Sequence, residues 1–332
     1  MEKINLEDHI YFTHSILKAL AQNRITTLIQ FIQEDPEKLS VLTKLNLPQI
    51  LEIRNNVFDK YSAPVISGAA LRYLTNKKHI PTGLKSLDAI MNEGIPIGCI
   101  TEICGLAGCG KSQLCMQLSI NCVKDCNNTI LYIDTKGDFS AVRIQKVLEM
   151  HGLSHEEMAV IMIKIRVVHV WCMEELMKLL EQLKRGIIKI DKLSLVIVDS
   201  LPCLQFQHFG DDNKLGLTYL NKVVNLSRCL SKELEIGFIY VNIQTRWIDQ
   251  DIPDVEGEEQ STSTNDPLYI ERRNRCLGKY WQTIPAALLL VEKDEHTVEN
   301  INDILIKVTV TKHINPYISK SCILKINKLG VS

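Results

Sequence analysis

The chain has 332 residues, of which 45% are hydrophobic and 23% charged, so it can bury a core large enough for one large domain and a small one. Its net charge of −1 and its pI of about 6.8 exclude a protein that holds DNA by overall positive charge, since such domains usually have a pI above about 9. Any contact with nucleic acid must come from local basic patches or from partners.

The cysteines indicate a reducing compartment. There are eleven of them, mostly inside apolar runs, and no CxxC pair occurs. Cys122 and Cys126 lack a second pair at zinc-like spacing, so we expect reduced core thiols in the nucleus or cytosol. The first residues carry no apolar signal segment, and no apolar run reaches the ~18 residues of a membrane span. The sequence therefore predicts a soluble intracellular protein.

Residues 1–58 follow a helical pattern. Apolar side chains recur at helical spacing between Ile16 and Ala21 and again between Ile50 and Val57. Asp35-Pro36 interrupts the pattern, and proline there suits the first turn of a new helix. The sequence predicts a small all-helical domain over 1–58, followed by a linker over 59–78 that shows no clear period.

From residue 79 to residue 332, strand-like and helical patterns alternate, which is typical of a parallel sheet with helices on both faces. The expected strands are Ile100–Cys104, Ile130–Ile133, Val167–Val170, Leu193–Val198 and Phe238–Val241. The expected helices are Lys111–Val123, Ser140–His151, Met173–Leu183 and Leu217–Leu230. Three strand-like runs without helices between them follow, so we expect antiparallel strands at the C-terminal end: Ala286–Val291, Ile304–Val310 and Ile323–Ile326.

A phosphate-binding loop is the most specific motif. The residues from Gly105 to Ser112 read GLAGCGKS and match GxxxxGK[ST] in full. Glycines let backbone N–H groups turn toward a phosphate, and the following helix adds the positive end of its dipole. Lys111 would reach the β- and γ-phosphates, and the Ser112 hydroxyl would ligate Mg²⁺. The alternative, a glycine turn at a helix start, does not require the lysine and serine.

A strand that ends in an acid should lie beside this loop. Leu195–Val198 is apolar and leads to Asp199, so we expect Asp199 to hold Mg²⁺ directly or through water. Alone the pattern is weak, because buried strands often end at an aspartate. Its value comes from its pairing with the loop.

Several blocks resemble the eukaryotic RecA-type recombinases. They are Pro81-Thr82-Gly83, Gly94–Gly98 with Ile100–Ile103, Leu131–Thr135, Val196–Ser200, Leu277–Trp281 and Leu288–Leu290, together with Asp35–Leu39 in the helical domain. Within that family the chain looks most like the D-type paralogs, through Ala69-Ala70-Leu71, Val167–Val170 and Leu277–Trp281. The resemblance covers nearly the whole chain and implies a RecA-like P-loop core behind a helical N-terminal domain.

The resemblance also implies ligands, partners and a compartment. It implies a nuclear subunit that binds ATP and Mg²⁺ and supports recombinase filaments on single-stranded DNA. Sister paralogs would bind on two sides, one through the N-terminal domain and linker and another through the ATPase core. Arg143 matches the arginine that packs over adenine, and Ser112 and Asp199 match the metal ligands. The expected nucleotide contacts are Gly105, Leu106, Ala107, Gly108, Cys109, Gly110, Lys111, Ser112, Gln113 and Arg143.

Two departures from the family bear on hydrolysis. Where its hydrolytic members place a glutamate that polarises water, this chain has Lys136, and a cation is no general base at neutral pH unless burial lowers its pKa by several units. Where they place a glutamine that senses the γ-phosphate, it has Ile243, and Gln244 would point to the opposite face. The alternative is that Lys136 is a solvated loop lysine and Asp138 serves as the base.

Two loops of this fold would approach DNA, roughly 205–213 and 245–275. The first carries little positive charge, and the second contains an acidic run from Asp249 to Glu259, which opposes binding to phosphates. Two interpretations of Trp247 are open: it stacks on a nucleic-acid base, or it only packs against protein side chains at the end of a strand. Two interpretations of the arginines that close the second loop are also open: they contact DNA phosphates, or they only keep the loop solvated. The candidate DNA contacts are Arg246, Trp247, Arg272, Arg273 and Arg275.

Three hypotheses follow. In the first, the chain is a paralog subunit that binds ATP and Mg²⁺ between subunits, hydrolyses ATP slowly and works in a complex on DNA in double-strand-break repair. In the second, it is a self-sufficient, DNA-stimulated ATPase that performs strand exchange. In the third, it is a scaffold with a structural nucleotide.

Overall fold

The computed structural model describes residues 3–62, 67–68, 79–208, 213–249, 270–294, 303–312 and 320–332. The chain divides into two compact units, Met1–Asn76 and Lys77–Ser332. Each unit has hydrophobic clusters of its own. The first residues of the expected linker 59–78 instead continue a helix that ends at Tyr61, and most of the rest of the linker, including Ala69-Ala70-Leu71, lies outside the described residues.

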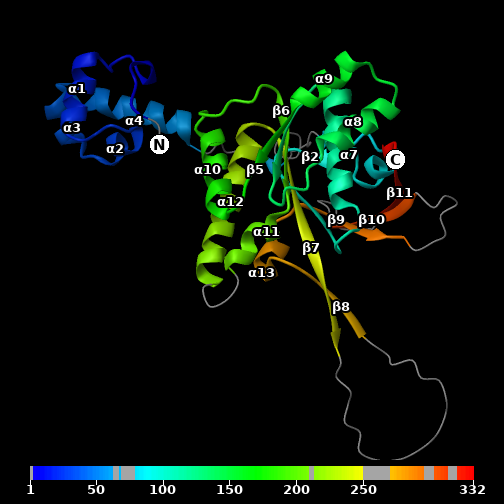
Figure 1. Cartoon of the computed structure of the whole chain (residues 1–332). Coiled ribbons are helices and arrows are strands. Elements are labelled where there is room, and N and C mark those ends of the chain that lie inside the picture. Colours follow the sequence, from blue (N-terminus) through cyan, green and yellow to red (C-terminus); the bar gives the residue numbers. More distant parts are fainter. Residues whose placement is uncertain are drawn as a thin grey trace, which may run out of the picture. The chain divides into compact units, whose positions relative to one another are not determined.

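The N-terminal unit is helical (Figure 1). Leu20, Phe31, Leu39, Ile50 and Ile53 are fully buried at its centre. Side chains of Thr13, Thr27, Asp35 and Asn46 accept hydrogen bonds from backbone N–H groups in the first turns of the helices, which satisfies donors that would otherwise lack partners. The elements are η1 (Leu6–Asp8), α1 (His14–Gln22), α2 (Leu28–Gln33), α3 (Pro36–Thr43) and α4 (Leu47–Tyr61).

The second unit is built on a large sheet whose order is β12-β11-β10-β9-β3-β7-β6-β4-β5, with β8 paired to β7. Strands from β9 to β5 in this order run parallel, and β10, β11 and β12 are antiparallel. The strands are β3 (Ile100–Gly105), β4 (Thr129–Asp134), β5 (Ile165–His169), β6 (Leu193–Asp199), β7 (Gly237–Asp249), β8 (Ile270–Arg275), β9 (Ala287–Lys293), β10 (Ile304–Lys312), β11 (Lys320–Asn327) and β12 (Gly330–Val331). A separate two-stranded sheet pairs β1 (His79–Ile80) with β2 (Ile95–Pro96).

Helices cover both faces of this sheet (Figure 1). In β4, Ile130 and Tyr132 join the cluster that contains α7, α8 and α9, while Leu131 and Ile133 join the cluster that contains α10 and α12. This alternation follows from the two-residue period of a strand. The helical elements are α6 (Lys85–Ile90), α7 (Lys111–Cys126), α8 (Ala141–Met150), α9 (His155–Lys164), α10 (Met173–Lys184), α11 (Leu201–Gln205), η2 (Phe206–His208), α12 (Asn213–Glu233) and α13 (Gly278–Gln282).

The predicted fold class is confirmed: a mostly parallel sheet lies between helices and ends in antiparallel strands. The principal difference lies in β7, which we expected to end at Val241 and which runs on to Asp249. It continues because β8 pairs with its outer half, from Gln244 opposite Arg275 to Asp249 opposite Ile270. The two ends of the expected loop 245–275 are therefore a hairpin ladder.

Candidate nucleotide-binding site

The phosphate loop joins β3 to α7, and two of its glycines are required by its surroundings. A Cβ on Gly105 would lie 2.1 Å from the carbonyl oxygen of Val291 in β9, so the backbones approach too closely for a side chain. Gly110 precedes α7 with a φ of +92°, where L-residues are strained. The spacing of the motif thus matches a loop pressed against the neighbouring strand.

Lys111 crosses back over the loop. Its Nζ donates hydrogen bonds to the carbonyl oxygens of Gly105 at 2.9 Å and Leu106 at 2.6 Å and lies 3.6 Å from Cys109 Sγ. The residue is buried. Ser112 follows it in the first turn of α7 and is half-buried. The loop thus holds an ammonium group beside the N-terminus of a helix, which is an arrangement that suits phosphate oxygens.

Asp199 ends β6 and is buried. Its Oδ2 accepts a hydrogen bond of 2.8 Å from the hydroxyl of Tyr132 in β4, while Oδ1 has no hydrogen-bond partner. A buried carboxylate oxygen without a hydrogen bond suits a metal ligand, but the ammonium of Lys136 lies 3.4 Å from this one. In the sheet, β7 lies between β6 and β3, the strand that leads into the phosphate loop.

Three charged side chains influence the ionisation of Cys115, which is buried in α7. Burial raises the pKa of the Cys115 thiol well above its usual value; the charge of Asp199 raises it further, while Lys111 and Lys136 lower it. All three charges therefore act on the same buried thiol of α7.

Asp134 organises the turn after β4. Its carboxylate accepts hydrogen bonds of 2.9 to 3.3 Å from the backbone N–H groups of Lys136, Gly137, Asp138 and Phe139. Burial opposes its ionisation, but these donors together lower the pKa of Asp134. The sequence reasoning passed over this role, although an aspartate followed by Thr-Lys-Gly-Asp is typical of a turn in which the side chain binds the backbone.

The turn aims Lys136 at Asp199. Its Nζ lies 3.4 Å from Asp199 Oδ1 and 3.1 Å from Asp138 Oδ2. Burial lowers the pKa of Lys136, but Asp199 and Asp138 raise it by more, so the net pKa is raised. Lys136 is therefore a permanent cation beside the candidate metal ligand. Asp138 is exposed, with its side chain 61% accessible, and its carboxylate is paired with this lysine.

Ile243 lies opposite Gly105 of the phosphate loop in the ladder between β3 and β7. The position expected to sense a γ-phosphate is thus next to the loop but holds an aliphatic side chain. Asn242, one residue earlier, donates to Glu102 Oε1 at 2.8 Å inside the sheet. Gln244 follows Ile243 in the same strand, where successive side chains point to opposite faces.

Arg143 lies in α8 and ties three segments together. Its Nε donates to Gln113 Oε1 at 2.9 Å, and its guanidinium also donates to the carbonyl oxygens of Asn327 and Lys328. A hollow of about 530 Å³ lies beside it, lined in part by Val142 and Met150, whose side chains are exposed. Gln113 and Arg143, both expected nucleotide contacts, are thus brought together.

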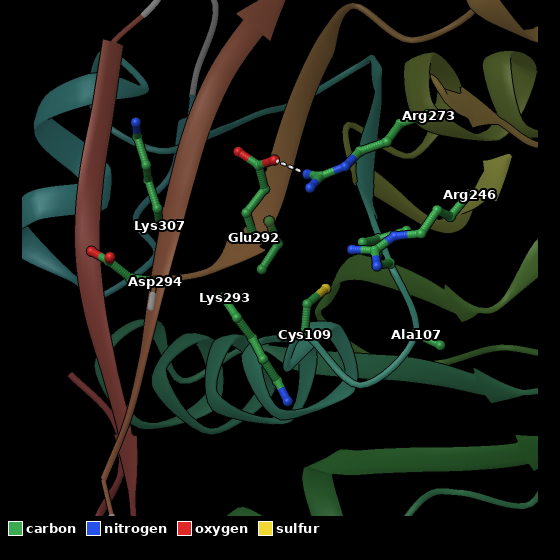
Figure 2. A pocket seen from close by; sticks show the side chains of 10 residues that line it. Ala107, Cys109, Arg246, Arg273, Glu292, Lys293, Asp294 and Lys307 are labelled. Carbon is green, nitrogen blue, oxygen red and sulfur yellow. Dashed lines mark hydrogen bonds and ion pairs between the residues drawn. The ribbon is translucent and has the colours of Figure 1, made fainter. Parts of the chain in front are cut away.

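A second cavity, of about 410 Å³, is lined in part by Ala107 and Cys109 of the phosphate loop (Figure 2). Arg246 and Arg273 face each other across the antiparallel ladder of β7 and β8, and both line this cavity. Arg273 Nη1 lies 2.6 Å from Glu292. Lys293 and Lys307 add positive charge from β9 and β10, and Asp294 adds a second carboxylate. Sequence reasoning missed these two lysines, because no local pattern connects them to the loop.

The other candidate DNA contacts, Arg275, Trp247 and Arg272, do not line this cavity among the described residues. Arg275 forms an ion pair of 3.0 Å with the buried Glu102, which anchors β8 to the sheet. Trp247 and Arg272 are paired residues of β7 and β8, but their side chains lie outside the described residues. The acidic run beyond Asp249, the segment Ser261–Thr264 and the acids Asp211 and Asp212 also lie outside them.

All eleven cysteines are free thiols. Among the described residues, no helix is both long and apolar enough to cross a membrane.

A family profile described as Rad51 matches residues 75–260, more than half of the chain, and spans the phosphate loop, Asp134, Lys136 and Asp199. The chain belongs to the Rad51 family. The match covers the part of the sheet that carries the site.

Relatives within the Rad51 family have similar lengths. DNA repair protein RAD51 homolog 4 of Bos taurus is 23% identical over 290 residues, covering 85% of this chain and 83% of that protein. DNA repair protein RAD51 homolog 2 of Mus musculus is 26% identical over 252 residues, covering 70% and 71%. DNA repair and recombination protein RadA of Metallosphaera sedula is 26% identical over 193 residues, covering 56% and 59%.

The fold also has a solved counterpart. The crystal structure of the RadB recombinase superposes with a TM-score of 0.56 and 17% identity, covering 76% of this chain and 98% of that one. This likeness shows the RecA-like fold. The relatives named as RAD51 homologs support the resemblance to recombinase paralogs, whereas identities near 23% leave the D-type assignment a proposal.

Proposed function

We propose that this chain is an ATP-binding recombinase paralog of the D type that acts in homologous-recombination repair of DNA double-strand breaks. The observation that carries this proposal is the intact phosphate loop, in which Lys111 binds the loop carbonyls, together with the buried Asp199 that ends β6 and pairs with Lys136. In this role the nuclear subunit assists recombinase filaments on single-stranded DNA as part of a paralog complex. The printed names of its relatives, which are DNA repair proteins, support this role.

ATP binds with its β- and γ-phosphates in the loop from Gly105 to Ser112. Lys111 exchanges its contacts with loop carbonyls for phosphate oxygens, which is a favourable exchange because both partners are then charged. The adenine lies by Arg143, next to the hollow lined by Val142 and Met150. Mg²⁺, when bound, neutralises phosphate charge, and Ser112 and Asp199 are the residues that would hold it.

Hydrolysis is slow in the isolated subunit. No carboxylate occupies the position of Lys136, and the ammonium there cannot accept a proton from water. Ile243 offers no amide beside the loop. These two residues favour a subunit that holds ATP over a self-sufficient, DNA-stimulated ATPase.

DNA contact within the complex uses local charge. The cavity beside the loop carries Arg246, Arg273, Lys293 and Lys307 against Glu292 and Asp294. Arg246 and Arg273 are opposite each other in the ladder of β7 and β8. A phosphodiester at this cavity would contact Arg246 and would compete with Glu292 for Arg273. Arg275 takes no part in this contact, because it pairs with Glu102.

Two surfaces bind sister paralogs. The N-terminal unit and linker hold one neighbour. On the core, β5 is an edge strand, and the hollow of about 620 Å³ beside it is lined by Leu131, Met162, Ile163, Val167 and Ile188, among others. An extended apolar segment of a second neighbour can add to that edge by backbone hydrogen bonds, with side chains in the hollow.

Three measurements on the purified protein test this function. Calorimetric titration with ATP and Mg²⁺ should show saturable binding, ATP turnover should remain slow with and without single-stranded DNA, and the protein should co-purify with sister paralogs. DNA-stimulated turnover at rates of a self-sufficient recombinase would favour the second hypothesis. A protein that binds no added ATP and retains a tightly held nucleotide through purification would favour the scaffold.

A further inference from the structure

Asp199, the candidate metal ligand, forms an ion pair with a lysine of the protein, Lys136. Asp199 Oδ1, the carboxylate oxygen without a hydrogen bond, has the ammonium of Lys136 at 3.4 Å. The side chain of Asp199 is 2% accessible, and that of Lys136 is 28% accessible. The charge of this buried aspartate is therefore already balanced by a cation that belongs to the protein.

The fold imposes this pairing. Asp134 and Asp199 are register partners at the ends of neighbouring strands β4 and β6. Asp134 fixes the turn that carries Lys136, and Thr135 exchanges hydrogen bonds of 2.7 and 2.8 Å with the backbone of Ser200, directly after Asp199. Both residues of the ion pair are thus held at the C-terminal ends of two neighbouring strands, β4 and β6.

The second carboxylate near Lys136 contributes less. Asp138 is mostly exposed, so water screens its attraction for the ammonium, whereas Asp199 attracts it from within the protein. A divalent cation that approaches Asp199 Oδ1 must share this oxygen with Lys136 and is repelled by its charge. The ammonium of Lys136 thus lies at the oxygen that a metal ion would bind, while Lys111 lies in the phosphate loop itself.

We propose that Lys136 is a built-in counter-ion that replaces much of the role of Mg²⁺ in this site, so that the chain binds ATP nearly as well without the metal as with it. The proposal rests on the proposed ATP-binding function. A tethered ammonium neutralises phosphate charge but cannot orient water as a coordinated metal does. The site therefore retains ATP as a stable ligand whatever the supply of magnesium.

Isothermal titration calorimetry tests this on the full-length protein, with ATP titrated in the presence of Mg²⁺ and again with excess EDTA. For the wild type we expect the dissociation constant to change by no more than about threefold on removal of the metal. Lys136→Gln, which removes the charge, should lose roughly tenfold or more on chelation, since a charge-assisted contact is worth about one decade or more in affinity. Lys136→Arg, which keeps the charge, should behave like the wild type.

The matched control is Lys124→Gln, which removes an exposed lysine at the far end of α7 and should leave both constants unchanged. A wild type that binds ATP with Mg²⁺ but loses it on chelation as strongly as Lys136→Gln would overturn the proposal and leave the ATP-binding function standing. A wild type that binds no ATP even with Mg²⁺ would overturn both.

Discussion

Arg275 Nη1 in β8 lies 3.0 Å from Glu102 Oε2 in β3, and that glutamate is fully buried in the strand that leads into the phosphate loop. Asn242 donates to its other oxygen at 2.8 Å. Burial raises the pKa of Glu102, while Asn242 and Arg275 oppose that rise. The base of the β7–β8 hairpin is thus joined by charge to the strand that positions the nucleotide.

Arg275→Ala should therefore destabilise the protein by about 3 kcal/mol, because it leaves a buried carboxylate without its cation. Urea denaturation followed by circular dichroism would measure this loss. Arg273→Ala is the matched control in the same strand: its partner Glu292 is partly exposed, so the change should cost about 1 kcal/mol or less. Equal losses for the two variants would contradict the structural role of Arg275.

Lys111→Ala should weaken ATP binding and leave the fold largely intact. The variant removes a charge-assisted contact with the β- and γ-phosphates worth about 1.5–3 kcal/mol, or one to two decades in affinity. Titration calorimetry gives the affinity, and the thermal transition without nucleotide reports the fold. Equal ATP affinity in the variant and the wild type would exclude this loop as the phosphate site.

Restoring the two missing hydrolytic side chains should raise ATP turnover cooperatively. Lys136→Glu supplies a base, and general-base assistance is typically worth roughly 10²–10⁴-fold. Alone it should recover little, since Ile243 still lacks an amide beside Gly105. The double variant Lys136→Glu, Ile243→Gln should exceed the combined effect of the single changes in steady-state turnover.

Asp138 provides the contrast for that experiment. It is paired with Lys136, so Asp138→Asn should leave the slow wild-type turnover essentially unchanged. Rapid turnover by the wild type that Asp138→Asn abolishes and Lys136→Ala does not affect would identify Asp138 as the base and refute the role given to Lys136.

The two units should bind different sister paralogs. Residues 1–78 contain the helical unit with its own core, and residues 79–332 contain the sheet with its open β5 edge. Each fragment, expressed alone and immobilised, should retain one paralog in a pull-down, and the two should differ. Substitution of Val167 by a charged residue in β5 should reduce capture by the core fragment only. Capture of the same paralog by both fragments, or of none by either, would refute this division.

The sequence by itself determined the phosphate loop, because a glycine-rich turn followed by a helix is a local structure whose chemistry stands in consecutive residues. It also identified the acidic end of β6 and the replacements at Lys136 and Ile243. The helical N-terminal elements and the parallel core followed from periods of 3.6 and two residues, which burial on one face or on alternate faces imposes.

Only the tertiary structure decided what these residues face. Lys136 was recognised as a replacement for the expected glutamate, but its contact with Asp199 depends on the adjacency of β4 and β6, which are separated by three helices and a strand in sequence. Arg275 was grouped with the other arginines by charge alone, and its buried partner lies 173 residues away. Periodicity indicates which face of an element is buried. Which strands become neighbours depends on the packing of the whole chain. That packing brings Lys136 into contact with Asp199, the candidate metal ligand.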